Sequence, residues 1–146
     1  MIFKAKGDTK RATDELRSLL SVNETNYRAH VELADLLEKQ GDAKGAAAAL
    51  DGAMYINPFE LPMHKRLAQL FRAAGERGKV VRERKAIVAL EPVDRADALY
   101  ELAVAYREAG DIARARATVL RSLEEAPNFE KAQTLLLGLR QQGAKP

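Results

Sequence analysis

The chain has 146 residues, of which 47% are hydrophobic and 31% are charged, and its formal net charge at pH 7 is +3. This length and composition allow one domain or one short repeat array, and they are ordinary for a mostly helical protein. The sequence contains no cysteine, which excludes disulfides, thiolate metal sites and cysteine nucleophiles, and so mild a charge does not by itself indicate a nucleic-acid partner.

The sequence contains no membrane-spanning stretch, because none of its apolar runs approaches the roughly 20 residues that a bilayer requires. The first ten residues, MIFKAKGDTK, are too short and too polar for a secretory signal. The compartment stays open between cytoplasm and periplasm, and the frequent use of Ala and Arg hints at a bacterial source.

Residues 1–26 predict one amphipathic helix, with Ala12, Leu16 and Leu19 on one face and Gly7–Asp8 as the turn before it. Six residues before that turn are too few for another helix, which needs about a dozen. Phe3 falls where such a helix would have its last core residue. We expect the second helix of a pair whose first helix is missing, and hence a C-terminal piece of a longer protein. The alternative is a natural start with a lone capping helix.

Residues 27–60 predict two short amphipathic helices that are joined at Gly41–Asp42 and closed by Pro58. Apolar and small residues recur at helical spacing on one face of each helix: His30, Leu33, Ala34 and Leu37 in the first, and Ala46, Leu50, Ala53 and Met54 in the second. A lone pair of this kind cannot bury both of its faces, so it needs copies of itself on either side.

The copies follow at residues 61–94 and 96–129, with Arg95 as an extra residue between them. A shift of 34 positions moves Gly41 onto Gly75, and a further shift of 35 moves it onto Gly110. Each glycine is expected to end a helix in the left-handed conformation. The aspartates after the first and third glycines are expected to cap the next helix, and Glu76 should cap less well.

The repeat at 61–94 is the irregular one, because Arg84 stands where its neighbours carry Leu50 and Val119. We expect the Arg84 guanidinium to reach solvent along its aliphatic stem, with support of a partner contact as the alternative. Residues 130–142 predict a C-terminal capping helix, a first helix without a second. It has more leucines than one buried face needs, which indicates either slack packing or a contact with a second copy or another domain.

Charge varies along the chain. Residues 61–90 carry eight basic and two acidic side chains, whereas residues 27–60 carry three basic and six acidic ones, and residues 96–129 four and six. The simpler interpretation is that these are solvated faces with favourable attraction between neighbouring repeats. The sharper interpretation is a binding surface.

The sequence shows no catalytic constellation. His30 and His64 occupy the same position in successive repeats, where packing between helices is the expected role. No Gly-rich phosphate loop, serine nucleophile elbow or HExxH motif occurs, so we predict no enzyme activity, cofactor or metal site.

The three units in register resemble the tetratricopeptide family, whose period is 34 residues. The resemblance implies an all-α fold, a right-handed superhelix of antiparallel helix pairs, in which the first helices line a concave groove that binds peptides. By position, that groove would contain Arg28, Asp35, Lys65, Gln69, Arg72, Tyr100 and Arg107. A family variant grips a C-terminal carboxylate with Lys and Asn at two positions that are Val31 and Asp35 here, so that clamp is not expected.

The leading hypothesis is a non-enzymatic interaction module that binds a peptide or helix, with an acidic or C-terminal segment as the expected ligand. One alternative is an accessory array attached to an upstream enzymatic domain. Another is self-association through the open N-terminal end. Nucleic-acid binding ranks last, because Phe71 is the only aromatic residue in the basic stretch 61–90 and base stacking uses several.

Overall fold

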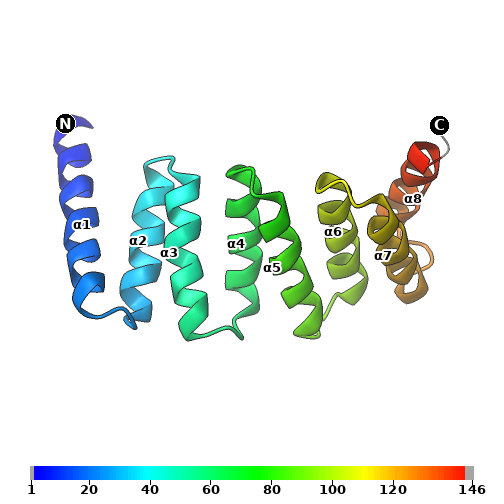
Figure 1. Cartoon of the computed structure of the whole chain (residues 1–146), viewed down its shortest axis with the longest axis horizontal. Helices are drawn as coiled ribbons and strands as arrows, with labels where there is room; N and C mark the ends of the chain where they lie inside the picture. The colour runs from blue at the N-terminus through cyan, green and yellow to red at the C-terminus, as the bar shows by residue number, and fades with distance from the viewer. Residues whose placement is uncertain (1, 144–146) are drawn as a thin grey trace. The chain divides into compact units, whose positions relative to one another are not determined.

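A computed structural model describes residues 2–143, with side chains described from residue 7 onward. Over that range the chain forms eight α-helices and no strand (Figure 1), which confirms the predicted all-α fold. The chain divides into two compact units, of which the first ends at Gly75 and the second begins at Glu76. Each unit is described separately.

The first unit contains α1 (Ile2–Val22), α2 (Tyr27–Lys39), α3 (Ala43–Ile56) and α4 (Leu61–Ala73), each packed against the next. The faces expected from the helical spacing meet in its core. Leu33, Ala34 and Leu37 of α2 are buried, as are Ala46, Leu50 and Ala53 of α3. The alanines allow the two helices to approach closely, and the leucines supply most of the buried apolar area.

The second unit contains α5 (Arg77–Ala89), α6 (Arg95–Glu108), α7 (Ile112–Glu125) and α8 (Glu130–Gly143). Consecutive helices pack on one another, and α6 also contacts α8. One cluster of buried side chains joins α6, α7 and α8 and consists of Ala103, Val104, Ala115, Val119, Ala132, Leu135 and Leu139.

Three of the four predicted turns are present. Gly41, Gly75 and Gly110 have φ of +77°, +75° and +84°, in the left-handed region that only glycine adopts without steric cost. The Asp42 carboxylate accepts a hydrogen bond from the backbone N–H of Gly45, and the Asp111 carboxylate accepts one from the backbone N–H of Arg114. Glu76 makes no capping bond and pairs with Lys79 at 2.9 Å, so the prediction of a weaker cap is confirmed.

The predicted turn at Gly7–Asp8 is wrong, because both residues lie inside α1, which runs unbroken through them. A glycine and an aspartate inside a helix each cost less than or about 1 kcal/mol, which 21 residues of helix can absorb. Gly7 is absent from the glycines with positive φ. The expectation for the side chain of Phe3 lies outside the described side chains.

The expectation for Arg84 in the second unit also needs correction. The Arg84 side chain is only 14% exposed, and its Nη2 lies 3.7 Å from Oε2 of Glu101 on α6. The guanidinium is therefore held by a carboxylate on the neighbouring helix and does not reach out to bulk solvent. Arg95, the extra residue between the repeats at 61–94 and 96–129, is the first residue of α6 and pairs with Glu125 at 3.2 Å.

Candidate functional site

Three of the predicted groove residues form an exposed stripe on α4. Lys65, Gln69 and Arg72 follow one another at the spacing of about one helical turn, and all three are exposed. Leu67 and Ala68, on the other side of the helix, are fully buried and fix its orientation. The stripe therefore presents two cations and one amide to solvent from a well-packed helix.

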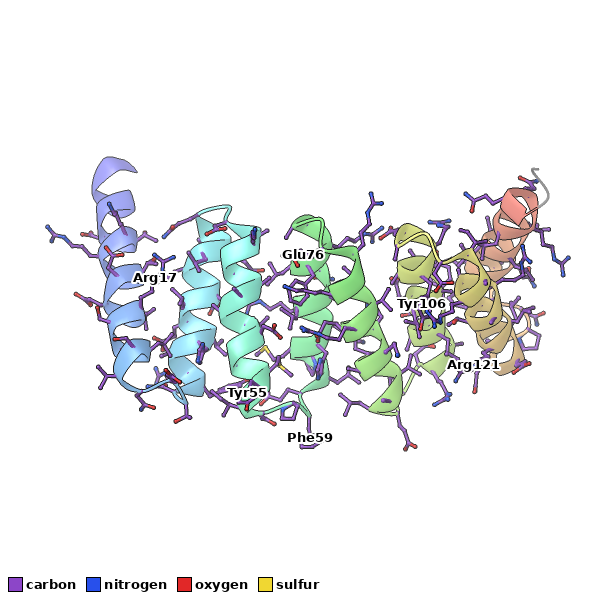
Figure 2. All side chains as sticks on the ribbon, viewed as in Figure 1. Arg17, Tyr55, Phe59, Glu76, Tyr106 and Arg121 are labelled. Carbon is purple, nitrogen blue, oxygen red and sulfur yellow. The ribbon has the colours of Figure 1, made fainter. Side chains whose placement is uncertain are left out.

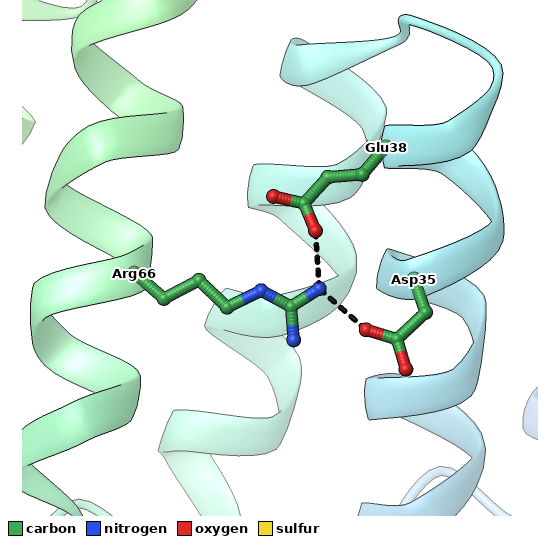
Figure 3. A network of polar contacts seen from close by, with 3 residues as sticks. All are labelled: Asp35, Glu38 and Arg66. Atoms are coloured by element: carbon green, nitrogen blue, oxygen red, sulfur yellow. Dashed lines mark hydrogen bonds and ion pairs between the residues drawn. The ribbon is translucent and has the colours of Figure 1, made fainter.

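Arg66, next to this stripe, bridges α4 to α2 (Figure 3). Its Nη2 lies 2.5 Å from Oδ1 of Asp35 and also donates a short hydrogen bond to Oε2 of Glu38. Burial lowers the pKa of Arg66, but the hydrogen bonds and charges of Glu38 and Asp35 outweigh it and leave the pKa raised. The guanidinium stays charged and holds the two helices together on this face of the unit.

Asp35, a predicted groove residue, therefore has a carboxylate oxygen engaged by Arg66. This role of Arg66 was not predicted from the sequence. A signal was present, because Arg66 stands 31 positions after Asp35, one helical turn short of the 34-residue repeat. In an array of stacked hairpins, that separation places two residues on neighbouring first helices.

Arg28, the other predicted groove residue on α2, lies in the first turn of the helix. Its side chain is 88% exposed and pairs with Glu32 on the same helix at 2.8 Å. Such an exposed pair contributes less than about 1 kcal/mol and can exchange for a ligand carboxylate.

The two remaining predicted residues belong to α6 in the second unit. Arg107 is exposed in the last turn of the helix. Tyr100 is half-buried, and its ring centroid lies 5.4 Å from that of Phe129 in an edge-to-face arrangement. Tyr100 therefore packs against the α6–α7–α8 core, and only part of its ring is available to a ligand.

The two histidines make hydrogen bonds of a structural kind. His30 Nε2 donates to the carbonyl of Glu24 at 2.9 Å, and His64 Nε2 donates to that of Pro58 at 2.7 Å. Gln133 on α8 repeats the arrangement, with its Nε2 2.8 Å from the carbonyl six residues earlier. Each side chain fastens its helix to the preceding loop, in agreement with the expected packing role. Within the described residues, no group of three His, Cys, Asp or Glu side chains is placed to hold a metal ion.

A second polar cluster fixes the loop between α3 and α4. Glu60 accepts hydrogen bonds from the hydroxyl of Tyr27 at 2.7 Å and from the amide of Asn57 at 2.8 Å. Burial, the hydrogen bond and the negative charge of Glu60 together raise the pKa of Tyr27 to about 12. The cluster attaches the start of α2 to the start of α4, and the sequence analysis missed it.

A pocket of about 490 Å³ lies between α1 and α2. Ala12, Leu16 and Leu19, which the sequence predicted to lack a covering helix, form the α1 side together with Glu15. The α2 side consists of Glu32, Asp35, Leu36 and Lys39. The lining thus combines four apolar residues with three acidic ones and one lysine.

Two aromatic side chains near the end of α3 are exposed, which the sequence did not predict. Tyr55 lies in the last turn of α3 and Phe59 in the loop that follows (Figure 2).

None of the described helices is both long and apolar enough to cross a bilayer.

Comparison with known families and structures gives a consistent result. Residues 4–75 and residues 65–128 match two family models, both described as tetratricopeptide repeat. A search of curated protein sequences finds no match. Together the two family matches span most of the chain.

Solved structures share the fold at low sequence identity. The crystal structure of MamA is 19% identical with a TM-score of 0.65, over 96% of this chain and 82% of that one. The first TPR of Spaghetti (RPAP3), bound to the HSP90 peptide SRMEEVD, is 19% identical with a TM-score of 0.63, over 84% of this chain and 97% of that one. The N-terminal domain of stress-induced protein-1 from C. elegans is 19% identical with a TM-score of 0.63, over 81% of this chain and 98% of that one.

Proposed function

Because the chain belongs to the tetratricopeptide repeat family, we propose that it is a non-enzymatic protein-interaction module that binds a peptide segment of a partner on its first helices. The observation that carries this proposal is the exposed stripe of Lys65, Gln69 and Arg72 on α4. Function in an array of this kind resides in surface side chains, since the repeats themselves are stabilised by their buried faces.

The charges on this face favour an acidic segment as the ligand. Arg66 offsets one of the two negative charges of Asp35 and Glu38 on the neighbouring helix, so these carboxylates repel an acidic peptide less than their number suggests. Lys65 and Arg72 remain exposed two turns apart. Lys65 offers a point charge, and Arg72 offers a planar fork that can bind a carboxylate through two hydrogen bonds.

A bound peptide is present in one of the similar structures, that of the RPAP3 domain with SRMEEVD. This supports the class of ligand but not the same contacts. The positions that would form a Lys and Asn clamp are Val31 and Asp35 here, and Asp35 is held by Arg66. We therefore propose binding through the side-chain carboxylates of the peptide, centred on α4.

The test begins with peptides selected on the intact chain from a random display library. The selected sequences should be rich in Asp and Glu. The double variant Lys65→Glu, Arg72→Glu should then bind them at least about tenfold more weakly, because attraction becomes repulsion at two sites. Binding is measured by fluorescence anisotropy with a labelled peptide.

A matched control reverses two exposed basic residues on second helices, Lys44→Glu on α3 and Arg121→Glu on α7. This control changes the net charge by the same amount and should leave the affinity within about twofold. Equal losses in both variants, or an unchanged affinity in the α4 variant, would remove the proposal.

A further inference from the structure

Within the part of the chain that the structure describes, helices α1 and α8 each have a face that lacks the neighbour found in a complete pair: α1 lacks a first helix, and α8 lacks a second. In the complete pair, Leu33, Ala34 and Leu37 of α2 are buried against Ala46, Leu50 and Ala53 of α3. Among the described residues, α1 has no first helix beside it and α8 has no second helix after it.

The α1 face corresponds to the α3 face by a shift of 34 positions, which places Ala12, Leu16 and Leu19 on Ala46, Leu50 and Ala53. Whereas the α3 residues are fully buried, Leu19 is 45% exposed. The same shift places Glu32 of α2 on Arg66 of α4. A helix bound in the pocket beside α1 and α2 would therefore take a position equivalent to that of α2 beside α3 and α4.

The α8 face corresponds to the α2 face. The hydrogen bond of Gln133 to the carbonyl six residues earlier marks it as the equivalent of His30. Counting from there, Leu136 and Leu137 correspond to Leu33 and Ala34. Leu137 is 60% exposed, although its counterpart in the complete pair is fully buried.

We propose that α8 of one copy of this chain docks into the pocket between α1 and α2 of another copy. The docked helix would lie beside α1 as α2 lies beside α3, and it would bury Leu137 against Leu16 and Leu19. This inference is independent of the proposed peptide ligand, because it uses none of the α4 side chains.

The two surfaces carry charged groups that can pair. Three carboxylates, those of Glu15, Glu32 and Asp35, line the pocket with one lysine, and two of them are also paired with Arg28 and Arg66. Arg140 follows Leu137 by one turn of α8 and is exposed. Gln141 corresponds to Glu38, which accepts a hydrogen bond from Arg66, and Glu32 corresponds to Arg66. The Gln141 amide would therefore face Glu32 and can donate to that carboxylate.

The distance between the docked α8 and α1 would be larger than that between α2 and α3, because Leu137 and Leu19 replace the smaller Ala34 and Ala53. Leu137 and Leu19 would keep the helices further apart and bury more apolar surface between them. A head-to-tail contact of this kind does not close on itself, so we expect chains whose length grows with protein concentration.

Sedimentation equilibrium of the 146-residue chain, from micromolar to millimolar concentration, tests the proposal. The average mass should rise with concentration. Leu137→Glu and Leu19→Glu should each weaken association at least about tenfold, because each would place a carboxylate against leucines. Val93→Glu, in the exposed α5–α6 loop, is the control and should associate like the parent chain.

Mixing the two variants identifies which surfaces meet. The Leu137→Glu protein keeps its α1 pocket, and the Leu19→Glu protein keeps its α8 face. Each alone should remain monomeric, and an equimolar mixture should form a dimer that does not grow. Far-UV circular dichroism establishes that both variants are folded, since both positions are partly exposed and neither lies in a closed core.

Three results would overturn the proposal. The first is a parent chain that stays monomeric up to millimolar concentration. The second is association that Leu19→Glu disrupts and Leu137→Glu does not, which would pair α1 with α1. The third is association that neither variant weakens, which would place the interface elsewhere.

Discussion

Nη2 of Arg66 on α4 lies 2.5 Å from Oδ1 of Asp35 on α2, although the two residues stand 31 positions apart in the sequence. The same nitrogen contacts Glu38, and one guanidinium thus serves two carboxylates. All three side chains are partly exposed. The bridge adds a charged connection between first helices to the apolar packing of the unit.

Removal of this bridge should destabilise the first unit. Arg66→Gln would leave Asp35 and Glu38 one turn apart without their cation, and we expect a loss of about 1 kcal/mol in the free energy of unfolding, a value already reduced for solvent screening. The loss should shrink in 1 M NaCl, where the Debye length is about 3 Å. Urea unfolding followed by circular dichroism measures both values.

Arg28→Gln is the control for this prediction. It also removes an arginine from a carboxylate, but from a pair in which the Arg28 side chain is 88% exposed. The expected change is within about 0.5 kcal/mol. Equal effects at the two positions would mean that the bridge contributes no more than an ordinary surface pair.

Tyr27 should make stability depend on pH in the alkaline range. The pKa of its hydroxyl is raised from 10.0 to about 12 in the folded chain. Between these values the unfolded chain has lost the proton and the folded chain has kept it, so the free energy of unfolding falls as pH rises. Tyr27→Phe should remove this component of the pH dependence and cost about 1 kcal/mol at pH 7, from the lost hydrogen bond to Glu60.

Absorbance at the tyrosinate band measures the same group directly. The difference between the titrations of the parent chain and of Tyr27→Phe isolates Tyr27. A difference curve with its midpoint near the unperturbed value would contradict the hydrogen-bonded, partly buried hydroxyl seen in the structure.

Gly7→Ala and Gly41→Ala should have opposite effects on stability. Gly7 lies inside α1, and a Cβ there meets open space among the described atoms, so alanine should stabilise the helix by about 0.5–1 kcal/mol. Gly41 has φ +77°, where alanine costs about 1–2 kcal/mol. Thermal unfolding of both variants compares them, and a destabilised Gly7→Ala protein would restore the turn that the sequence suggested.

Arg84 and Glu101 should be energetically coupled across α5 and α6. A double-mutant cycle with Arg84→Ala and Glu101→Gln should give a coupling free energy of about 0.5–1 kcal/mol, because the pair is only partly screened by solvent. The single variants alone would mix this coupling with lost packing of the arginine stem. A coupling near zero would support a guanidinium that points to solvent.

The sequence predicted the features that depend on local chemistry. Gly41, Gly75 and Gly110 adopt the left-handed turns that their positions required, and Asp42 and Asp111 cap the helices that follow. These outcomes follow from the backbone preference of glycine and from the reach of an aspartate carboxylate to nearby N–H groups.

Prediction failed where a local signal competed with context. Gly7–Asp8 has the same letters as Gly41–Asp42, yet it continues a helix, because neither residue forbids helical backbone. Arg84 could reach solvent as well as Glu101, and only the position of α6 decided between them. The seven groove residues were placed by analogy with one family pattern, and their role in binding stays a prediction.

The sequence by itself determined the helices, their turns and the family, since these depend on periodic burial and on backbone preferences that recur in every repeat. The tertiary structure decided which charges are engaged and which faces are left uncovered. Asp35 is held by Arg66, and Leu19 and Leu137 remain partly exposed. The pairing of Asp35 with Arg66 joins residues 31 positions apart, and its energy depends on a distance that no local pattern of residues specifies.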